Sequence, residues 1–169
     1  YIKVVSPNFE LEYGLSDADV GARLKKLIKF SETNEKSKTL FVWPEGVFSG
    51  YSFDELKPFK KIFQKNFKEN HAILFGANKL NLEKDAYHNS LIIVNNEMEI
   101  LQEYKKQKLV PFGEFLPFEK ILNKLGLKKI TEGHGSFLAG KKQKNLIHDN
   151  LNILPLICYE IIFTKFIQN

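Results

Sequence analysis

The sequence contains a single cysteine, Cys158, which has no possible partner within the chain. This excludes an internal disulfide framework and a metal site built on paired cysteines. Arginine is equally scarce, because Arg23 is the only one among 25 basic residues. Arginine makes the bidentate contacts to guanine and phosphate, so its scarcity argues against a protein that reads nucleic-acid sequence.

Long apolar runs are also missing. The longest, such as 91–94 and 153–158, fall far short of the roughly 18 to 20 residues that cross a bilayer. The given sequence begins at Tyr1 on an alternating apolar segment, not on the charged-then-apolar pattern of a signal peptide. Such a start is typical of a piece of a longer protein, and we expect this chain to be one.

The apolar content, 43% hydrophobic and 13% aromatic residues, is enough for the core of one ordinary domain. Apolar periodicity predicts two helices, at 17–32 and 56–67. Alternation and turn residues predict the strands, at 1–6, 39–43, 72–77, 87–94, 99–104, 145–148 and 151–158. This order predicts an α/β fold with a mixed sheet and helices on one side. Because the chain ends shortly after the last strand, we expect later strands to be missing.

The candidate chemistry begins at Cys158, which follows an apolar segment and precedes Tyr159 and Glu160. We interpret the segment as a strand that ends at Cys158, with a helix over 159–167. A thiol at such a corner lies near backbone N–H groups that can receive an oxyanion, and a helix N-terminus favours the thiolate. The alternative is a small buried hydrophobic residue, as most single cysteines are.

Two further segments place charged residues in apolar surroundings. Glu45 follows a proline at the end of a short strand, so a stiff backbone holds its carboxylate at the rim of the sheet. The alternative is a solvated loop residue. Lys105, Lys106 and Lys108 lead into a turn that is rich in phenylalanine and carries Glu114. Strand alternation places Lys106 and Lys108 opposite Lys105 but does not separate those two. A charge inside so apolar a turn needs a partner.

Three segments together carry a family resemblance: WPE at 43–45, YKKQKLVPFGEFLP at 104–117 and ICYE at 157–160. In this order they resemble the nitrilase, or carbon–nitrogen hydrolase, superfamily with its Glu–Lys–Cys triad. The middle segment is similar to the apolipoprotein N-acyltransferase family within it. The resemblance implies a nitrilase-like α-β-β-α sandwich with a mixed sheet. Residues 1–169 would form a partial domain that is incomplete at its C-terminal end.

Motif by motif, the resemblance implies Glu45 as the general base, Lys106 as the lysine that stabilises the transition state and Cys158 as the nucleophile. We expect no metal and no other cofactor, because no second ligand stands at a suitable spacing from His88 or His134. The supporting residues of the family site are matched by Glu114, Tyr159 and Glu160.

The implied reaction is acyl transfer in two steps. The Cys158 thiolate attacks an ester of a phospholipid acyl donor, and the thioester then passes the acyl group to the N-terminal diacylglyceryl-cysteine of a lipoprotein. The resemblance also implies a bacterial inner membrane location, with the catalytic domain on the periplasmic face and anchored by transmembrane helices outside this chain. We expect the 169-residue chain to be inactive in isolation.

Two other functions stay open at this point. A soluble nitrilase-type amidase that acts on small carbon–nitrogen substrates would use the same triad. It would differ in the segment LVPFGEFLP and would lack upstream hydrophobic helices. The other is a lysine-rich, non-enzymatic module for anionic surfaces. Lysine is spread over every segment without a dense patch, which argues against such a module.

Overall fold

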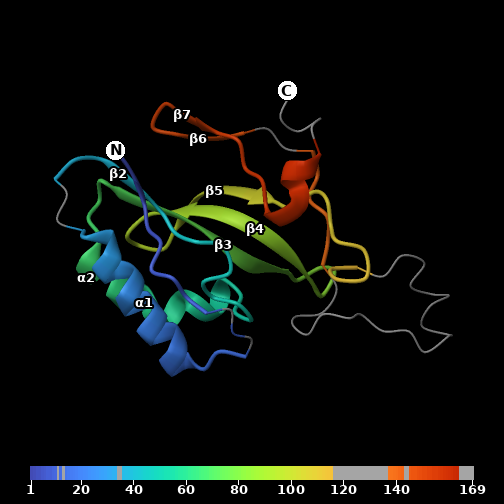
Figure 1. Cartoon of the computed structure of the whole chain (residues 1–169), viewed down its shortest axis with the longest axis horizontal. Helices are drawn as coiled ribbons and strands as arrows, with labels where there is room; N and C mark the ends of the chain where they lie inside the picture. The colour runs from blue at the N-terminus through green and yellow to red at the C-terminus, as the bar shows by residue number, and fades with distance from the viewer. Residues whose placement is uncertain (11, 13, 34–35, 116–136, 143–144, 164–169) are drawn as a thin grey trace.

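The computed structural model describes residues 1–10, 12, 14–33, 36–115, 137–142 and 145–163. Its centre is a five-stranded sheet in the order β1-β2-β3-β4-β5 (Figure 1). The first three strands run parallel, and β3, β4 and β5 are antiparallel, so the predicted α/β fold with a mixed sheet is confirmed. The strands are β1 (Ile2–Val4), β2 (Thr39–Val42), β3 (His71–Asn81), β4 (Ala86–Val94) and β5 (Ile100–Lys105).

Two helices cover one face of this sheet (Figure 1). Helix α1 (Asp17–Ser31) begins at a capping box between Ser16 and Asp19 and agrees with the prediction for 17–32. The second predicted helix is divided into a 3-10 helix, η1 (Asp54–Phe59), and α2 (Lys60–Asn66). Pro58 lies inside η1, and a proline has no N–H to donate to a regular α-helical ladder.

The C-terminal part lies across the other face of the sheet (Figure 1). It contains a short hairpin, β6 (Leu146–His148) and β7 (Leu151–Ile153), and a 3-10 helix, η3 (Cys158–Ile162). The predicted strand over 151–158 was wrong beyond Ile153, because 154–157 join no ladder and Pro155 lacks a donor for one. The predicted helix starts at Cys158 rather than after it. Its expected end at 164–167 lies outside the described residues.

Side chains from successive strand positions build two separate cores. Ile73 and Phe75 of β3 point toward the helices and pack with Phe41 and Phe63, whereas Leu74 joins a smaller cluster on the opposite face. In the part of the chain that the structure describes, no helix is long and apolar enough to cross a membrane.

Candidate active site

Cys158 is an exposed free thiol and the first residue of η3. Its φ angle is 54°, in the left-handed region that residues other than glycine seldom occupy. The preceding residue is extended, so the backbone turns sharply at the cysteine. Strained backbone of this kind is found at functional sites when the surrounding structure holds it in place.

Lys106 directly follows β5, and its side chain is only 2% exposed. Its Nζ lies 2.9 Å from each oxygen of the Glu114 carboxylate. The same ammonium lies 5.4 Å from the centre of the Tyr159 ring, a cation–π contact. Lys108 is exposed. The structure therefore separates two lysines that strand alternation placed on the same face.

The Glu114 carboxylate is held by two further donors. Its Oε2 accepts the backbone N–H of Val110 at 2.9 Å, and its Oε1 accepts the side-chain amide of Asn89 at 3.2 Å. Asn89 was not among the site residues predicted from the sequence. The available signal was a polar residue in β4 on the same face as the apolar Leu91. Lys106 is fixed to the same strand, because its N–H donates to the Asn89 carbonyl at 2.8 Å.

Tyr159 of η3 is the third side chain packed together with Lys106 and Glu114. Its hydroxyl donates to the Leu109 carbonyl at 2.7 Å. Burial, together with the negative charges of the nearby Glu114 and Glu160 carboxylates, raises the pKa of the Tyr159 hydroxyl. The phenol therefore remains a neutral hydrogen-bond donor at physiological pH.

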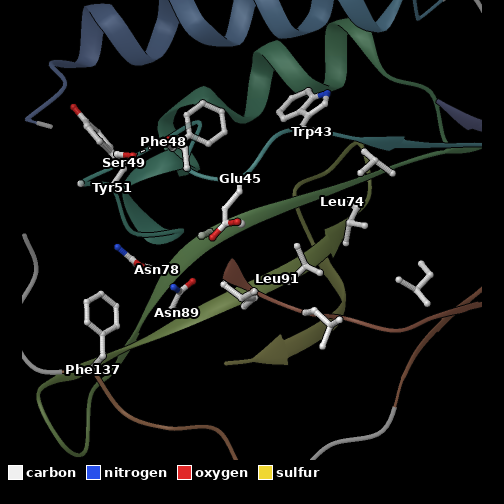
Figure 2. A pocket seen from close by; sticks show the side chains of 18 of the residues that line it. Trp43, Glu45, Phe48, Ser49, Tyr51, Leu74, Asn78, Asn89, Leu91 and Phe137 are labelled. Carbon is white, nitrogen blue, oxygen red and sulfur yellow. Dashed lines mark hydrogen bonds between the residues drawn. The ribbon is translucent and has the colours of Figure 1, made fainter. Parts of the chain in front are cut away.

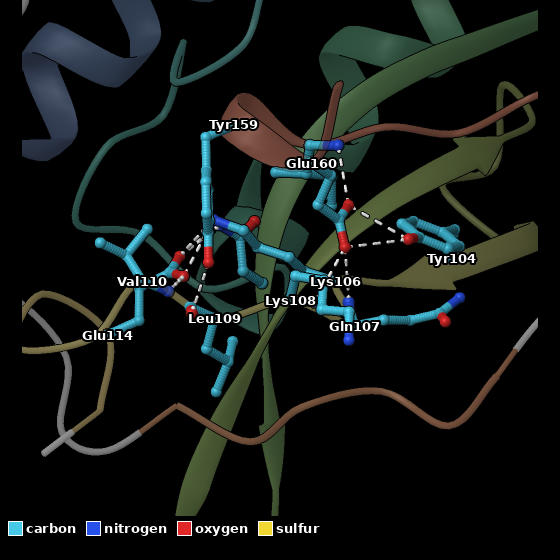
Figure 3. A network of polar contacts seen from close by, with 11 residues as sticks. Tyr104, Lys106, Gln107, Lys108, Leu109, Val110, Glu114, Tyr159 and Glu160 are labelled. Carbon is cyan, nitrogen blue, oxygen red and sulfur yellow. Dashed lines mark hydrogen bonds and ion pairs between the residues drawn. The ribbon is translucent and has the colours of Figure 1, made fainter. Parts of the chain in front are cut away.

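Glu160 is fully buried and occupies a different place (Figure 3). Its carboxylate accepts the Tyr104 hydroxyl at 3.1 Å and the backbone N–H groups of Gln107, Lys108 and Ile157 at 2.8, 3.0 and 3.0 Å. These bonds join the segment after β5 to the residue before Cys158. Glu160 therefore positions the backbone on both sides of the site.

Glu45 lies in the turn after β2. Gly46 adopts a φ of 70°, which lets the chain reverse directly after the carboxylate, and Arg23 of α1 donates to the Val47 carbonyl at 3.3 Å. Trp43 anchors the start of the turn, because its indole N–H donates to the buried Ser31 hydroxyl at 3.1 Å. The exposed Glu45 side chain is thus carried by a fixed backbone.

Glu45 faces a cavity of about 820 Å³ on the sheet face opposite the helices (Figure 2). Asn89 and Ile157 also line this cavity, the first bonded to Glu114 and the second adjacent to Cys158. No hydrogen bond or ion pair joins Glu45 directly to Lys106 or Cys158 in the part of the chain that the structure describes. Direct contacts thus join Lys106, Glu114 and Tyr159, while Glu45 faces the adjoining cavity.

The described residues contain no group of three His, Cys, Asp or Glu side chains that could hold a metal ion. The arrangement instead offers an exposed thiol, a carboxylate on a cavity and a buried ammonium. Groups of these three kinds can act chemically as a nucleophile, a proton acceptor and an anion-stabilising group.

The family model for carbon–nitrogen hydrolases matches residues 12–167. This chain belongs to the carbon–nitrogen hydrolase family. Among curated relatives, the chain is 30% identical over 171 residues to the apolipoprotein N-acyltransferase of Brucella suis biovar 1. It is 28% identical over 174 residues to that of Bradyrhizobium diazoefficiens. Both alignments cover 96% of this chain and 32% of the relative, so this carbon–nitrogen hydrolase chain spans about a third of the length of the curated relatives it matches.

Solved structures show the same fold. A carbon–nitrogen hydrolase from Helicobacter pylori G27 superposes with a TM-score of 0.55 at 18% identity, covering 90% of this chain and 49% of that one. The NitFhit protein of C. elegans gives 0.58 at 15% identity, covering 98% and 39%. The expected nitrilase-like fold class is confirmed for this carbon–nitrogen hydrolase.

Proposed function

We propose that this chain is catalytic sequence of an apolipoprotein N-acyltransferase that works through a thioester on Cys158. The buried Lys106–Glu114 ion pair, which packs on Tyr159 beside the exposed Cys158, supports the thioester chemistry. The similarity of 96% of the chain to curated apolipoprotein N-acyltransferases supports acyl transfer over amide hydrolysis. A buried ammonium is costly unless it is paired, so a lysine kept dry against the residue that follows the cysteine is suited to receive a developing negative charge.

In the first step the Cys158 sulfur attacks the ester carbonyl carbon of a phospholipid acyl donor. A C–S bond forms, and the thiol proton passes to Glu45, because an unassisted thiol is only a few per cent thiolate at neutral pH. Lys106 stabilises the oxyanion. The C–O bond then breaks, and Glu45 returns the proton to the departing lysophospholipid.

In the second step the α-amino group of a diacylglyceryl-modified lipoprotein cysteine attacks the thioester. A C–N bond forms and the C–S bond breaks, while Glu45 takes a proton from the amine and returns it to the Cys158 sulfur. Two acceptors compete for the same thioester, an amine and water. The amine is the better nucleophile toward a thioester, and the aliphatic side chains in the cavity wall further disfavour water there.

We also propose a cellular location for the protein, because its substrates are found in membranes. Both the donor and the acceptor are lipids or carry lipids, so the site must open toward a membrane. We place the catalytic domain on the periplasmic face of a bacterial inner membrane, anchored by transmembrane helices in the rest of the protein.

Mass spectrometry of the full-length protein after incubation with phosphatidylethanolamine tests this function. We expect an acyl adduct on Cys158 that hydroxylamine removes and that an amine-bearing diacylglyceryl peptide discharges as an N-acyl peptide. Cys158→Ser should abolish the thioester. If the protein instead hydrolyses small amides and forms no lipid adduct, it is a nitrilase-type amidase.

A further inference from the structure

The cavity beside Glu45 changes character along its length. Its floor is the face of β3 and β4 that carries Leu74, Gly76 and Asn78 on one strand and Asn89 and Leu91 on the other. Asn78 pairs with Asn89, and Gly76 pairs with Leu91. One end of the floor is therefore amide-lined and the other is aliphatic.

Figure 2 shows the Glu45 carboxylate between these two ends, with Asn78 and Asn89 on one side and Leu74 and Leu91 on the other. The hairpin and the segment after it add further aliphatic side chains to the cavity wall, from Ile153, Leu154 and Leu156. A ligand that fits both ends carries a polar carbonyl group next to a flexible apolar tail.

Gly76 lies on the cavity floor, at the boundary between its amide-lined end and its aliphatic end. It shares its face with Leu74 and Asn78, so a side chain there would project into the cavity. The nearest atom to such a Cβ is the Ser90 carbonyl oxygen at 3.9 Å, an ordinary contact distance. The glycine is thus not required by the backbone, and its effect is to leave the floor of the cavity open.

We infer that the gap over Gly76 is the passage through which the acyl chain of the donor runs, and that Gly76 sets the length of the chain that is transferred. This inference rests on the proposed acyl transfer. The ester is held at the polar end near Glu45, and the tail passes Gly76 toward Leu74. Each methylene that is buried improves binding about fourfold, so a closed passage penalises long chains and spares short ones.

The test compares two acyl donors in full-length protein, phosphatidylethanolamine with palmitoyl chains and with butyryl chains, in detergent micelles. The readout is the initial rate of the hydroxylamine-labile adduct on Cys158. Gly76→Leu should lower the palmitoyl-to-butyryl rate ratio by at least about tenfold, the loss of a few buried methylenes. Ala18→Leu adds comparable bulk at an exposed position of α1 and should keep the ratio of the unsubstituted protein.

Gly76→Val provides a second variant that a strand should accept, because β-branched residues suit strands. Valine is smaller than leucine, so it should lower the palmitoyl-to-butyryl rate ratio less. If the palmitoyl-to-butyryl rate ratio is unchanged in both variants, even when both rates fall by the same factor, Gly76 does not set the chain length. The thioester mechanism is unaffected by that result. Absence of any adduct in the unsubstituted protein with both donors instead contradicts the proposed function, and this inference with it.

Discussion

Lys106 shows how a single residue can be buried and still be charged. Its ammonium has left water almost completely, and the Glu114 carboxylate and the Tyr159 ring replace the lost hydration. Such a cation has little reorganisation to undergo when an oxyanion forms beside it. Preorganised charge of this kind is usually the largest single contribution to acyl-transfer catalysis.

Lys106→Ala should therefore slow thioester formation on Cys158 by about two to three orders of magnitude, the usual loss of an oxyanion donor. The initial rate of adduct formation, followed by mass spectrometry in the full-length protein, measures this effect. Lys108→Ala is the matched control, because Lys108 lies two positions away and its side chain is exposed. This variant should form the thioester at nearly the rate of the unsubstituted protein. Equal rates for both variants would contradict the role given to Lys106.

Glu160 is a buried carboxylate with a structural task, and its replacement should first affect folding. In Glu160→Gln an amide NH₂ group faces donors such as the Tyr104 hydroxyl and the Ile157 N–H. We expect the free energy of unfolding to fall by about 2–4 kcal/mol, because a buried donor is left unsatisfied and a charge-assisted bond is lost. Urea unfolding measures the change. Glu83→Gln, at an exposed turn position, should unfold as the unsubstituted protein does.

At the scale of elements, backbone hydrogen bonds from the segment 137–140 hold the chain in place at both Lys106 and Glu114. Phe137 N–H donates to the Glu114 carbonyl at 3.2 Å, and Gly140 N–H donates to the Lys106 carbonyl at 2.8 Å. Leu138 N–H donates to the Tyr87 carbonyl at 2.7 Å. The backbone that carries the Lys106–Glu114 ion pair is thus fixed from outside the motif that contains both residues.

Gly140→Ala tests this attachment. A Cβ at this position would overlap the carbonyl oxygen of Lys105 and lie 2.7 Å from its Cβ, so the segment must shift away from Lys106. We expect the rate of thioester formation to fall by at least about tenfold, as small displacements of catalytic groups do. Ala139→Ser is the control, because this neighbouring side chain is exposed and the change is small. A Gly140→Ala rate equal to that control would show that Lys106 keeps its place without the segment.

Local periodicity predicted most elements of this fold, and the exceptions have local causes. Helix α1 was predicted to within one residue, because its cap and apolar spacing agree. The strand predicted up to Cys158 failed at Pro155, since an apolar run alone does not distinguish a paired strand from an extended segment. The burial of Lys106 over Lys108 depends on contacts with Glu114 and Tyr159, which no strand pattern encodes.

Across the described part of the molecule, each face of the sheet has its own buried core, and the cavity lies on the face away from the helices. The face under α1 and α2 is packed with large aromatic side chains, among them Trp43, Phe63 and Phe75. The opposite face carries the cavity, with Glu45 at its edge and Ile157 on its wall. The motif WPE spans both, because Trp43 is buried in the aromatic core and Glu45 emerges from it two residues later.

The stability of the whole chain should also depend on His88, which is 8% exposed and has its Nδ1 2.9 Å from the Leu138 carbonyl oxygen. Burial, with the nearby positive charge of Lys105, lowers the pKa of His88 below its ordinary value of 6.5 despite that hydrogen bond and the nearby negative charge of Glu103. The unfolded chain then binds the proton more tightly than the folded one.

The free energy of unfolding should accordingly be highest above pH 6.5 and fall as the pH drops through the window between 6.5 and the lower pKa of the folded state. One proton limits this slope to about 1.4 kcal/mol per pH unit. Urea unfolding across that window measures it, with His88→Gln as the comparison, because a glutamine cannot gain a proton there. If both proteins lose stability equally as the pH falls, His88 is not the residue responsible, and the carboxylates that titrate at lower pH account for the loss.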